Sequence, residues 1–374
     1  MIRLSKSCLG KEEQRAVVSV LEKEFLGMGD EVQKFEHELS QFFGRPVVCV
    51  VNGTAALHLA LQAAGVRAGD EVLVPSLTYV ASFQAISATG AIPIACDINE
   101  KTLTLDYASM SSRVTNKTKA VMPVHYSGGV GDLCAIYDFA KKHKLRVIED
   151  AAHAFGTEYR GERIGSFGDI SCFSFDGIKN ITSGEGGCIV SGDERIIAAI
   201  KDSRLLGVEK DTEKRFSGQR SWEVSVSRQG WRYHMSNIMA AIGIEQLKKF
   251  PQMADKRQKL AKKYDSLLIG NEYVQIIHHN YDEVVPHIYV IRIESMDFRD
   301  LLRDELLKLG IQTGVHWQPN HQLDFYAEHQ VGLPTTEKIY PHLLTLPLHP
   351  DLSDEDVEYI CKNLLELIKS NNGK

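Results

Sequence analysis

Short apolar runs alternate with helical patterns along the first 250 positions of the chain. Most of the runs are apolar at successive positions, which is typical of strands buried on both faces of a parallel sheet. The pattern therefore predicts an α/β fold in which helices cover both sides of a mostly parallel central sheet. The predicted strands lie at 70–76, 92–98, 169–175 and 186–193 and at the starts of 46–66, 119–129 and 146–156, and the predicted helices lie at 11–24, 30–44, 81–90 and 132–144 and in the rest of 46–66.

The pattern changes at about Phe250, where a long charged helix begins. A chain of 374 residues is long for a single simple core. We therefore predict a large domain over residues 1–250 and a smaller C-terminal α+β domain over residues 251–374. Its other predicted elements are a strand at 287–294 and helices at 298–310 and 354–370.

Charge and composition narrow the class of protein. The net charge of −6 argues against a nucleic-acid partner, which would need a basic face. No apolar run reaches the length of a membrane span, and the N-terminus lacks the apolar segment of a signal peptide. We therefore expect a soluble cytoplasmic enzyme with neither nucleic acid nor membrane as a partner. The seven cysteines form no CxxC pair, and buried, reduced thiols are expected at Cys8, Cys49, Cys96, Cys172 and Cys188.

A candidate phosphate site lies where the first predicted strand ends. Gly53 and Thr54 follow that strand and begin an Ala/Leu-rich helix. The first turn of a helix offers free backbone N–H groups and the positive end of the helix dipole, and a glycine lets an anion approach closely. The alternative is a plain helix cap, made by Asn52 or Thr54, with no bound anion.

Two acid–base candidates lie in the segment 146–156. Asp150 ends the predicted strand, and a buried carboxylate there needs a partner such as a protonated ring nitrogen. The alternative is that Asp150 caps the following turn. His153 lies three residues further on, on or near the same turn. It is either a hydrogen-bond donor to a ligand oxygen or a structural histidine.

A lysine lies among turn-forming residues after the predicted strand at 169–175. Ser174 is near the end of that apolar run, and Lys179 lies in the turn beyond it, ahead of Ser-Gly-Glu-Gly-Gly. A lysine amine is a nucleophile only when its pKa is lowered, as happens in a partly dry, glycine-lined pocket. The alternative is a solvated lysine on a surface hairpin.

Together these candidates fit one cofactor. A phosphate site, a carboxylate and a lysine all fall at the carboxyl ends of predicted strands, where α/β sheets bind ligands. Pyridoxal 5'-phosphate (PLP) needs all three, because its phosphate must be anchored, its ring nitrogen kept protonated and its aldehyde held by a lysine that also moves protons. We expect no metal site, because the chain has no HExxH or paired Cys/His motif.

With these residues in place, the chain resembles a known family, the DegT/DnrJ/StrS sugar-nucleotide aminotransferases of PLP fold type I. The resemblance extends over nearly the whole chain. Its most specific part is Lys-Asn-x-Thr-x-x-Glu-Gly-Gly, which follows Glu-Asp-Ala-Ala at the family's distance. It implies a large PLP-binding domain with a mostly parallel sheet and a smaller C-terminal α+β domain. The segments that carry it include NGTAALHLAL, GDEVLVPSLTYVAS, VIEDAAHAFGTEYRGERIGSFGDISCFSF, KNITSGEGG, MSNIMAAIG and LGIQTGVHW.

The resemblance also implies a role for each candidate residue. Lys179 holds the cofactor covalently and acts as acid and base, Asp150 pairs with the ring nitrogen, and His153 contacts the ring hydroxyl. The phosphate is assigned to Gly53, Thr54 and Ser174, the two faces of the ring to Tyr79 and Ala152, and the substrate side to Tyr79, Glu185 and His316.

One position departs from the family pattern. Members commonly have Gly-Tyr-Asn-Tyr-Arg-Met-Ser where this chain has Gly-Trp-Arg-Tyr-His-Met-Ser at 230–236. That asparagine reaches across the dimer to the neighbouring phosphate, and Arg232 stands in its place here. The resemblance implies a homodimer with shared active sites. Because an arginine fork suits a phosphate, we expect Arg232 to keep the role of that asparagine. The alternative is that Arg232 turns away to an acidic side chain.

The implied activity is transfer of an amino group from L-glutamate to a keto carbon of a nucleotide-linked keto-deoxysugar, as in the synthesis of lipopolysaccharide O-antigens. The segment 214–230 resembles that of members that aminate C4, although a 3-keto acceptor uses the same scaffold. Lys179 favours transamination, since relatives that dehydrate deoxysugars have histidine at that position. A PLP-dependent deoxysugar dehydratase and a non-catalytic sugar- or PLP-binding regulator are the alternatives. The nucleotide base and the stereochemistry stay open.

Overall fold

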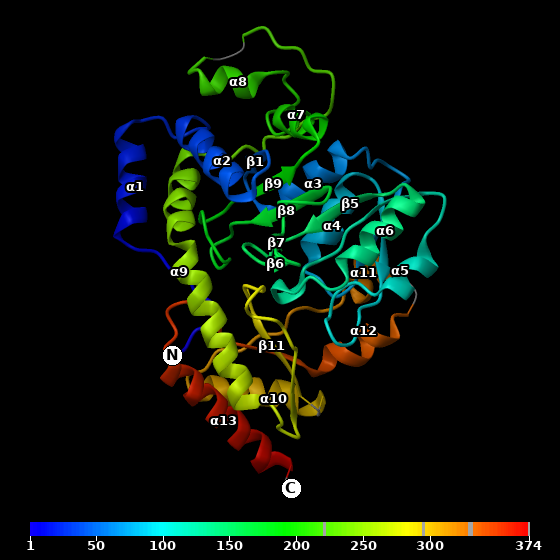
Figure 1. The fold of residues 1–374 in the computed structure, drawn as a ribbon, viewed down its shortest axis with the longest axis vertical. Coiled ribbons are helices and arrows are strands. Elements are labelled where there is room, and N and C mark those ends of the chain that lie inside the picture. Colours follow the sequence, from blue (N-terminus) through cyan, green and yellow to red (C-terminus); the bar gives the residue numbers. More distant parts are fainter. Residues whose placement is uncertain (220–221, 294–295, 328–331, 373–374) are drawn as a thin grey trace.

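The structure is a computed structural model that describes residues 1–219, 222–293, 296–327 and 332–372. A seven-stranded sheet with helices on both faces forms its larger part, and a three-stranded sheet with its own helices forms the smaller part (Figure 1). The predicted fold class is therefore confirmed. Arg220, Ser221 and Glu294, which belong to segments discussed above, lie outside the described residues.

The large sheet brings three strand ends to one edge. Its order is β1-β9-β8-β5-β4-β2-β3, and β9 runs antiparallel to both of its neighbours, β1 and β8. Because β9 reverses between them, β1 points the same way as β8, which is parallel to β5. The carboxyl ends of β1, β5 and β8 therefore lie at the same edge of the sheet. The strands are β1 (Val47–Val50), β2 (Glu71–Pro75), β3 (Ile92–Cys96), β4 (Thr118–Val121), β5 (Arg146–Asp150), β8 (Ile170–Ser174) and β9 (Gly187–Ser191), with a separate hairpin of β6 (Glu158–Tyr159) and β7 (Glu162–Arg163).

Both faces of this sheet are buried against packed side chains. In β1, Val48 and Val50 pack into a core that includes residues of α3, α4 and α7, whereas Val47 and Cys49 pack on the other face with residues of α2 and α9. Burial on both faces explains why the strands read as continuous apolar runs. The helices of this part are α1 (Lys11–Glu22), α2 (Asp30–Phe43), α3 (Gly53–Ala63), α4 (Val80–Ala88), α5 (Tyr107–Arg113), α6 (Leu133–His143), α7 (Glu194–Ser203) and α8 (Asp211–Phe216).

The smaller part shares a helix with the larger one. The helix α9 (Asn237–Leu268) runs from α1 and α2 to the C-terminal α13 (Figure 1), so it passes through the predicted boundary after residue 250. Pro251 lies inside α9 without ending it. The division at 250/251 stays a prediction. The remaining elements are β10 (Val274–Ile276), β11 (Tyr289–Ile293), β12 (Leu343–Leu346), α10 (Met296–Lys308), α11 (Asp324–Ala327), α12 (Pro334–Ile339) and α13 (Asp354–Asn372).

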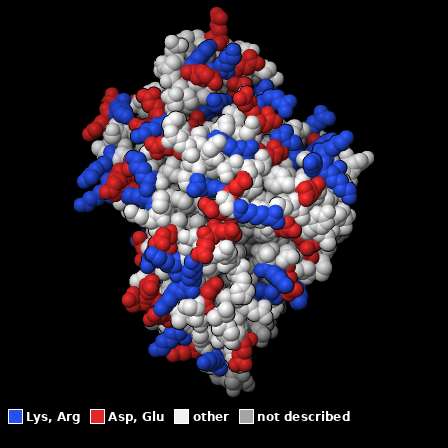
Figure 2. Space-filling model, viewed as in Figure 1, with Lys and Arg blue, Asp and Glu red and all other residues white. Residues whose placement is uncertain are grey.

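Lys and Arg side chains are mixed with Asp and Glu side chains over the face shown in Figure 2. No helix in the described ranges combines the length and the hydropathy that a membrane crossing requires.

Four of the five cysteines expected to be buried are buried, but Cys8 is only half-buried, because the N-terminal segment that carries it lies on the surface.

A buried ion pair protects the edge strand β1. Arg204, fully buried just after α7, pairs with Glu36 of α2 and donates to the carbonyl oxygen of Cys49 at 2.7 Å. Glu36 Oε1 accepts the N–H of the same Cys49 at 2.7 Å. The ion pair therefore satisfies the two outward-facing backbone groups of Cys49, which would otherwise be an open sheet edge.

Replacing Arg204 should destabilise the fold strongly. Arg204→Ala leaves the buried Glu36 carboxylate without its counter-charge, and we expect the free energy of unfolding to fall by about 3–5 kcal/mol. Denaturant unfolding followed by circular dichroism measures this change. The control is Arg195→Ala on the exposed side of α7, with an expected change within about 0.5 kcal/mol. A loss under about 1 kcal/mol for Arg204→Ala would contradict the role of the pair.

Candidate active site

A cavity of about 440 Å³ opens at the carboxyl edge of the large sheet. The ends of β1, β5 and β8, the starts of α3 and α4 and the loop after β8 form one side of it. His287, His316 and Trp317, from the second part of the chain, form the other. Ten of the eleven predicted site residues line this cavity, and Arg232 does not. The ten are Gly53, Thr54, Tyr79, Asp150, Ala152, His153, Ser174, Lys179, Glu185 and His316.

The start of α3 is both capped and open to an anion. Asn52 caps the helix by accepting the Ala55 N–H at 2.8 Å, so the predicted capping alternative is present. The N–H groups of Gly53 and Thr54 have no partner within the described residues. A Cβ on Gly53 would lie 2.9 Å from Ser174 Cβ, so only glycine lets the start of α3 come this close to the end of β8. Two free amides beside a serine hydroxyl suit a phosphate.

Two donors fix the carboxylate of Asp150. Its Oδ2 accepts the Ser82 hydroxyl at 2.6 Å, and its Oδ1 accepts the Ala152 N–H at 3.2 Å. The bond to the Ala152 N–H is the turn cap that was the alternative role of Asp150. The carboxylate makes this bond and still lines the cavity. Ser82 is in turn 2.8 Å from the hydroxyl of Thr78. Ser82 was not predicted as a site residue, since a serine inside a predicted helix carries no signal of its own.

Lys179 is partly buried and faces the cavity. Its Nζ lies 3.4 Å from Nε2 of His287. Burial lowers the pKa of Lys179 to about 8, although Asp150 and Asp176 act in the opposite direction. The alternative of a solvated hairpin lysine is therefore wrong. A lysine with this pKa is partly neutral near physiological pH, so it can accept a proton.

Three neutral imidazoles surround the lysine. The ring of His153 lies 4.3 Å from that of His287 and 5.0 Å from that of Trp317, measured between centroids. Burial lowers the pKa of His153 and of His287 well below the usual value, and that of His316 to about 4. Nδ1 of His153 accepts the Ser127 N–H at 3.3 Å, which leaves the ring proton on Nε2.

Aromatic and acidic groups complete the lining. Tyr79 is 56% exposed, and its ring centroid lies 5.9 Å from that of Trp317. Burial and the neighbouring Asp176 raise the pKa of Glu185. Three further lining residues were not predicted from the sequence: Asp176, His287 and Trp317. The only signal for Trp317 was its position next to His316.

Arg232 lies outside the cavity of its own chain. It pairs with the buried Leu205, just after α7, in an isolated antiparallel bridge. Its side chain forms no ion pair with an acidic residue in the described ranges, so the predicted alternative of an acidic partner is not seen there.

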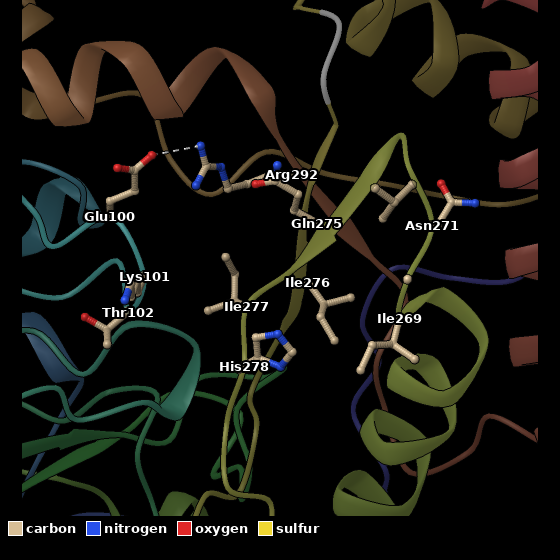
Figure 3. A pocket seen from close by; sticks show the side chains of 12 residues that line it. Glu100, Lys101, Thr102, Ile269, Asn271, Gln275, Ile276, Ile277, His278 and Arg292 are labelled. Atoms are coloured by element: carbon tan, nitrogen blue, oxygen red, sulfur yellow. Dashed lines mark hydrogen bonds and ion pairs between the residues drawn. The ribbon is translucent and has the colours of Figure 1, made fainter.

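Another hollow, of about 690 Å³, lies between the loop after β3 and strand β10 (Figure 3). A polar contact at 3.4 Å joins Glu100 to Arg292, and Ile276 and Ile277, which also line the hollow, are apolar. It brings no lysine together with a buried carboxylate, so we assign the chemistry to the smaller cavity. Across the described ranges, no group of three or more His, Cys, Asp or Glu side chains is placed to hold a metal ion.

The chain belongs to the DegT/DnrJ/EryC1/StrS aminotransferase family, whose model matches residues 7–365. It is 35% identical, over 96% of its length and 95% of that protein, to the spore coat polysaccharide biosynthesis protein SpsC of Bacillus subtilis. The predicted family is therefore confirmed.

Solved structures support the same assignment. Spr1654 of Streptococcus pneumoniae, assigned as a sugar aminotransferase, superimposes in its PMP form with a TM-score of 0.93 at 31% identity, covering 99% of this chain and 100% of that one. PseC of Helicobacter pylori, an aminotransferase of pseudoaminic acid biosynthesis, gives 0.92 at 29% identity, covering 99% of both chains. Spr1654 is also known in a PLP form, so the cofactor prediction is confirmed as well.

The pKa of Lys179 predicts a pH profile for its reactivity. Below pH 8 the amine carries a proton and is unreactive, so labelling of cofactor-free protein by trace fluorodinitrobenzene should rise about tenfold per pH unit. Above pH 8 the labelling should level off. Mass spectrometry of the Lys179 peptide measures this profile, with the exposed Lys117 as internal standard. A midpoint near 10.5, the ordinary lysine value, would contradict desolvation of the amine.

Proposed function

We propose that the protein is a PLP-dependent aminotransferase that moves an amino group from L-glutamate to C4 of a nucleotide-linked keto-deoxysugar. The observation that carries this proposal is the meeting of three groups in one cavity: the amine of Lys179, the carboxylate of Asp150 and the free amides of Gly53 and Thr54. They lie where three strands end, and no single one of them would suffice.

The residues present fit the cofactor. The amides of Gly53 and Thr54 and the hydroxyl of Ser174 would hold its phosphate. Asp150 would bind the protonated ring nitrogen, since Ser82 and the Ala152 N–H hold the carboxylate in one orientation. Ala152 and Tyr79 would contact the ring, and the Nε2–H of His153 would donate to the ring hydroxyl. When bound, the cofactor supplies an electron sink next to the reacting carbon.

Lys179 moves the proton in both half-reactions. As a neutral amine it would take a proton from the donor carbon that bears the amino group and give it up on the cofactor side. In the second half-reaction it would carry a proton the opposite way, to the sugar carbon that receives the amino group. Acid–base catalysis of this kind contributes on the order of 10²–10⁴ in rate. His316 and Trp317 cover the amine from the second part of the chain and keep bulk water from it.

The sugar acceptor is supported by the relatives and by the substrate side of the cavity. SpsC and PseC bear names that refer to polysaccharide and pseudoaminic acid biosynthesis. Glu185, whose pKa is raised, and His316 offer hydrogen bonds suited to sugar hydroxyl groups. The choice of C4 over C3 rests on the segment 214–230 alone. The cytoplasmic location stays a prediction.

The test is the visible absorption of the purified protein. PLP should produce the band of the lysine-bound cofactor, L-glutamate should abolish it, and a nucleotide-linked 4-keto-6-deoxysugar should restore it. Lys179→Ala should lower product formation by at least about 100-fold. Nuclear magnetic resonance of the product then places the amino group on C4 or C3.

The alternatives give different results in the same experiment. A band that ignores glutamate while the sugar loses water would identify the dehydratase. A band that never forms, in protein that still binds the sugar, would identify the regulator. An amino group on C3 would leave the aminotransferase intact and overturn only the choice of carbon.

A homodimer with shared active sites is supported by the charge of the cavity. Asp150, Asp176 and Glu185 line it, and Lys179 is the only Lys or Arg among its described lining residues. Glutamate and a nucleotide-linked sugar are anions, so a single chain offers them too few cations. In a homodimer, Arg232 would supply a positive charge to the partner's cavity. Its segment also exposes apolar side chains, and Trp222 is 89% exposed.

Mixing two variants, at a PLP concentration too low to fill the sites of the Arg232→Ala homodimer, tests this shared site. Arg232→Ala should weaken PLP binding by about tenfold or more, because it removes a charge-assisted bond to the phosphate. Random mixed dimers of Arg232→Ala with Lys179→Ala contain one intact site in half of the dimers, so activity should return to about a quarter of wild type. Unchanged PLP affinity in Arg232→Ala, or no recovery on mixing, would place Arg232 outside the partner's site.

A further inference from the structure

We infer that His287 is the positioning residue that holds the Lys179 amine where it exchanges protons. This inference rests on the proposed function, because it concerns the lysine that the reaction uses. The sequence pattern places His287 only at the start of a strand. The structure instead places its ring inside the cavity, next to the lysine.

His287 is the one hydrogen-bond partner of the Lys179 side chain within the described ranges. The distance between Nζ and Nε2 is 3.4 Å, and His287 is 3% exposed. A lysine side chain has four rotatable bonds and loses much rotational freedom when it is held in one position. A fixed partner is therefore what keeps its amine facing the reacting carbon.

Two hydrogen bonds fix the backbone of His287, and one ring contact fixes its imidazole. Its backbone N–H donates to the carbonyl of Ser127 at 3.2 Å, and its own carbonyl accepts from the buried Arg257 at 3.1 Å. The ring lies against His153, with centroids 4.3 Å apart. These contacts tie the segment before β11 to the loop after β4 and to α9, and they hold the imidazole beside Lys179.

His287 is not a proton relay. Its Nδ1 is buried and has no hydrogen-bond partner within the described residues, so a proton taken up at Nε2 has no group to pass to. Burial also keeps the ring neutral. A neutral imidazole accepts a hydrogen bond from the protonated amine and thereby favours that form.

The other charged and titratable groups around the amine act differently. Asp150 and Asp176 raise its pKa through their charge, and Arg257 lowers it. His153 and His316 are neutral neighbours from the other elements that enclose it. None of these five groups forms a recorded hydrogen bond to Nζ, so their effects persist when His287 is changed.

The experiment compares two variants of His287. One keeps an aromatic ring without a hydrogen-bond acceptor, and the other keeps a hydrogen-bond acceptor without a ring. His287→Phe keeps the contact with His153 and removes the acceptor, and His287→Gln places an oxygen at about the reach of Nε2. Fluorodinitrobenzene labelling of Lys179 against pH is measured in cofactor-free protein. We expect the midpoint to fall by about one pH unit in the Phe variant and to stay within about 0.3 of wild type in the Gln variant.

The control is His279→Phe. His279 is a half-buried histidine on the same segment, also bonded to Ser127, but it does not line the cavity. It should leave the Lys179 midpoint unchanged. If His287→Phe does not fold, as judged by circular dichroism, His287→Leu takes its place with the same expected shift.

The loaded enzyme provides a second measurement. His287→Phe should lower the single-turnover rate with glutamate by about tenfold while KM stays within about twofold, and His287→Gln should restore the rate. A Lys179 midpoint that is unchanged or raised in the Phe variant, or that falls equally in the Gln variant, would overturn the inference. The labelling uses neither cofactor nor sugar, so its result stands even if the proposed acceptor proves wrong.

Discussion

A lysine that exchanges protons near neutral pH must lie in a dry place beside a carboxylate without being locked to it in an ion pair. In this cavity desolvation prevails over the attraction of Asp150 and Asp176, and the pKa of Lys179 falls to about 8. The oxygens of Asp150 are occupied by Ser82 and by the Ala152 amide. That arrangement keeps the carboxylate oriented toward a ring nitrogen and leaves the amine free to move its proton.

The sheet topology produces this arrangement with few residues. Because β9 reverses between β1 and β8, the ends of β1, β8 and β5 lie at one edge, and each ends in a functional group. The close contact at Gly53 sets the distance between the start of α3 and Ser174. The second part of the chain then closes the cavity with His287, His316 and Trp317, so the dryness that Lys179 needs comes from the junction of the two parts.

The site residues at strand ends could be predicted from the sequence. Gly53, Asp150 and Ser174 follow or end runs whose apolar pattern is strong, and the parallel fold brings such ends together. Residues supplied from afar carry no such signal. His287 lies 108 positions from Lys179, and its contact depends on how β11 packs, which no local pattern encodes. The sequence pattern also predicted that a new, charged helix begins at about Phe250, because charged residues dominate from there on. In the structure α9 passes through Phe250 and Pro251 without a break, and it is packed at both ends.

The neutrality of the imidazoles decides where the proton resides. The pKa of Lys179 is about 8 and that of His316 is about 4, so moving a proton from the lysine to this ring crosses about four units, or about 5 kcal/mol. His153 and His287 are also shifted well below their usual value, for the same reason of burial. A proton that Lys179 takes from the substrate therefore stays on the lysine until the substrate takes it back. The histidines shape and dry the cavity, and the lysine alone carries the proton.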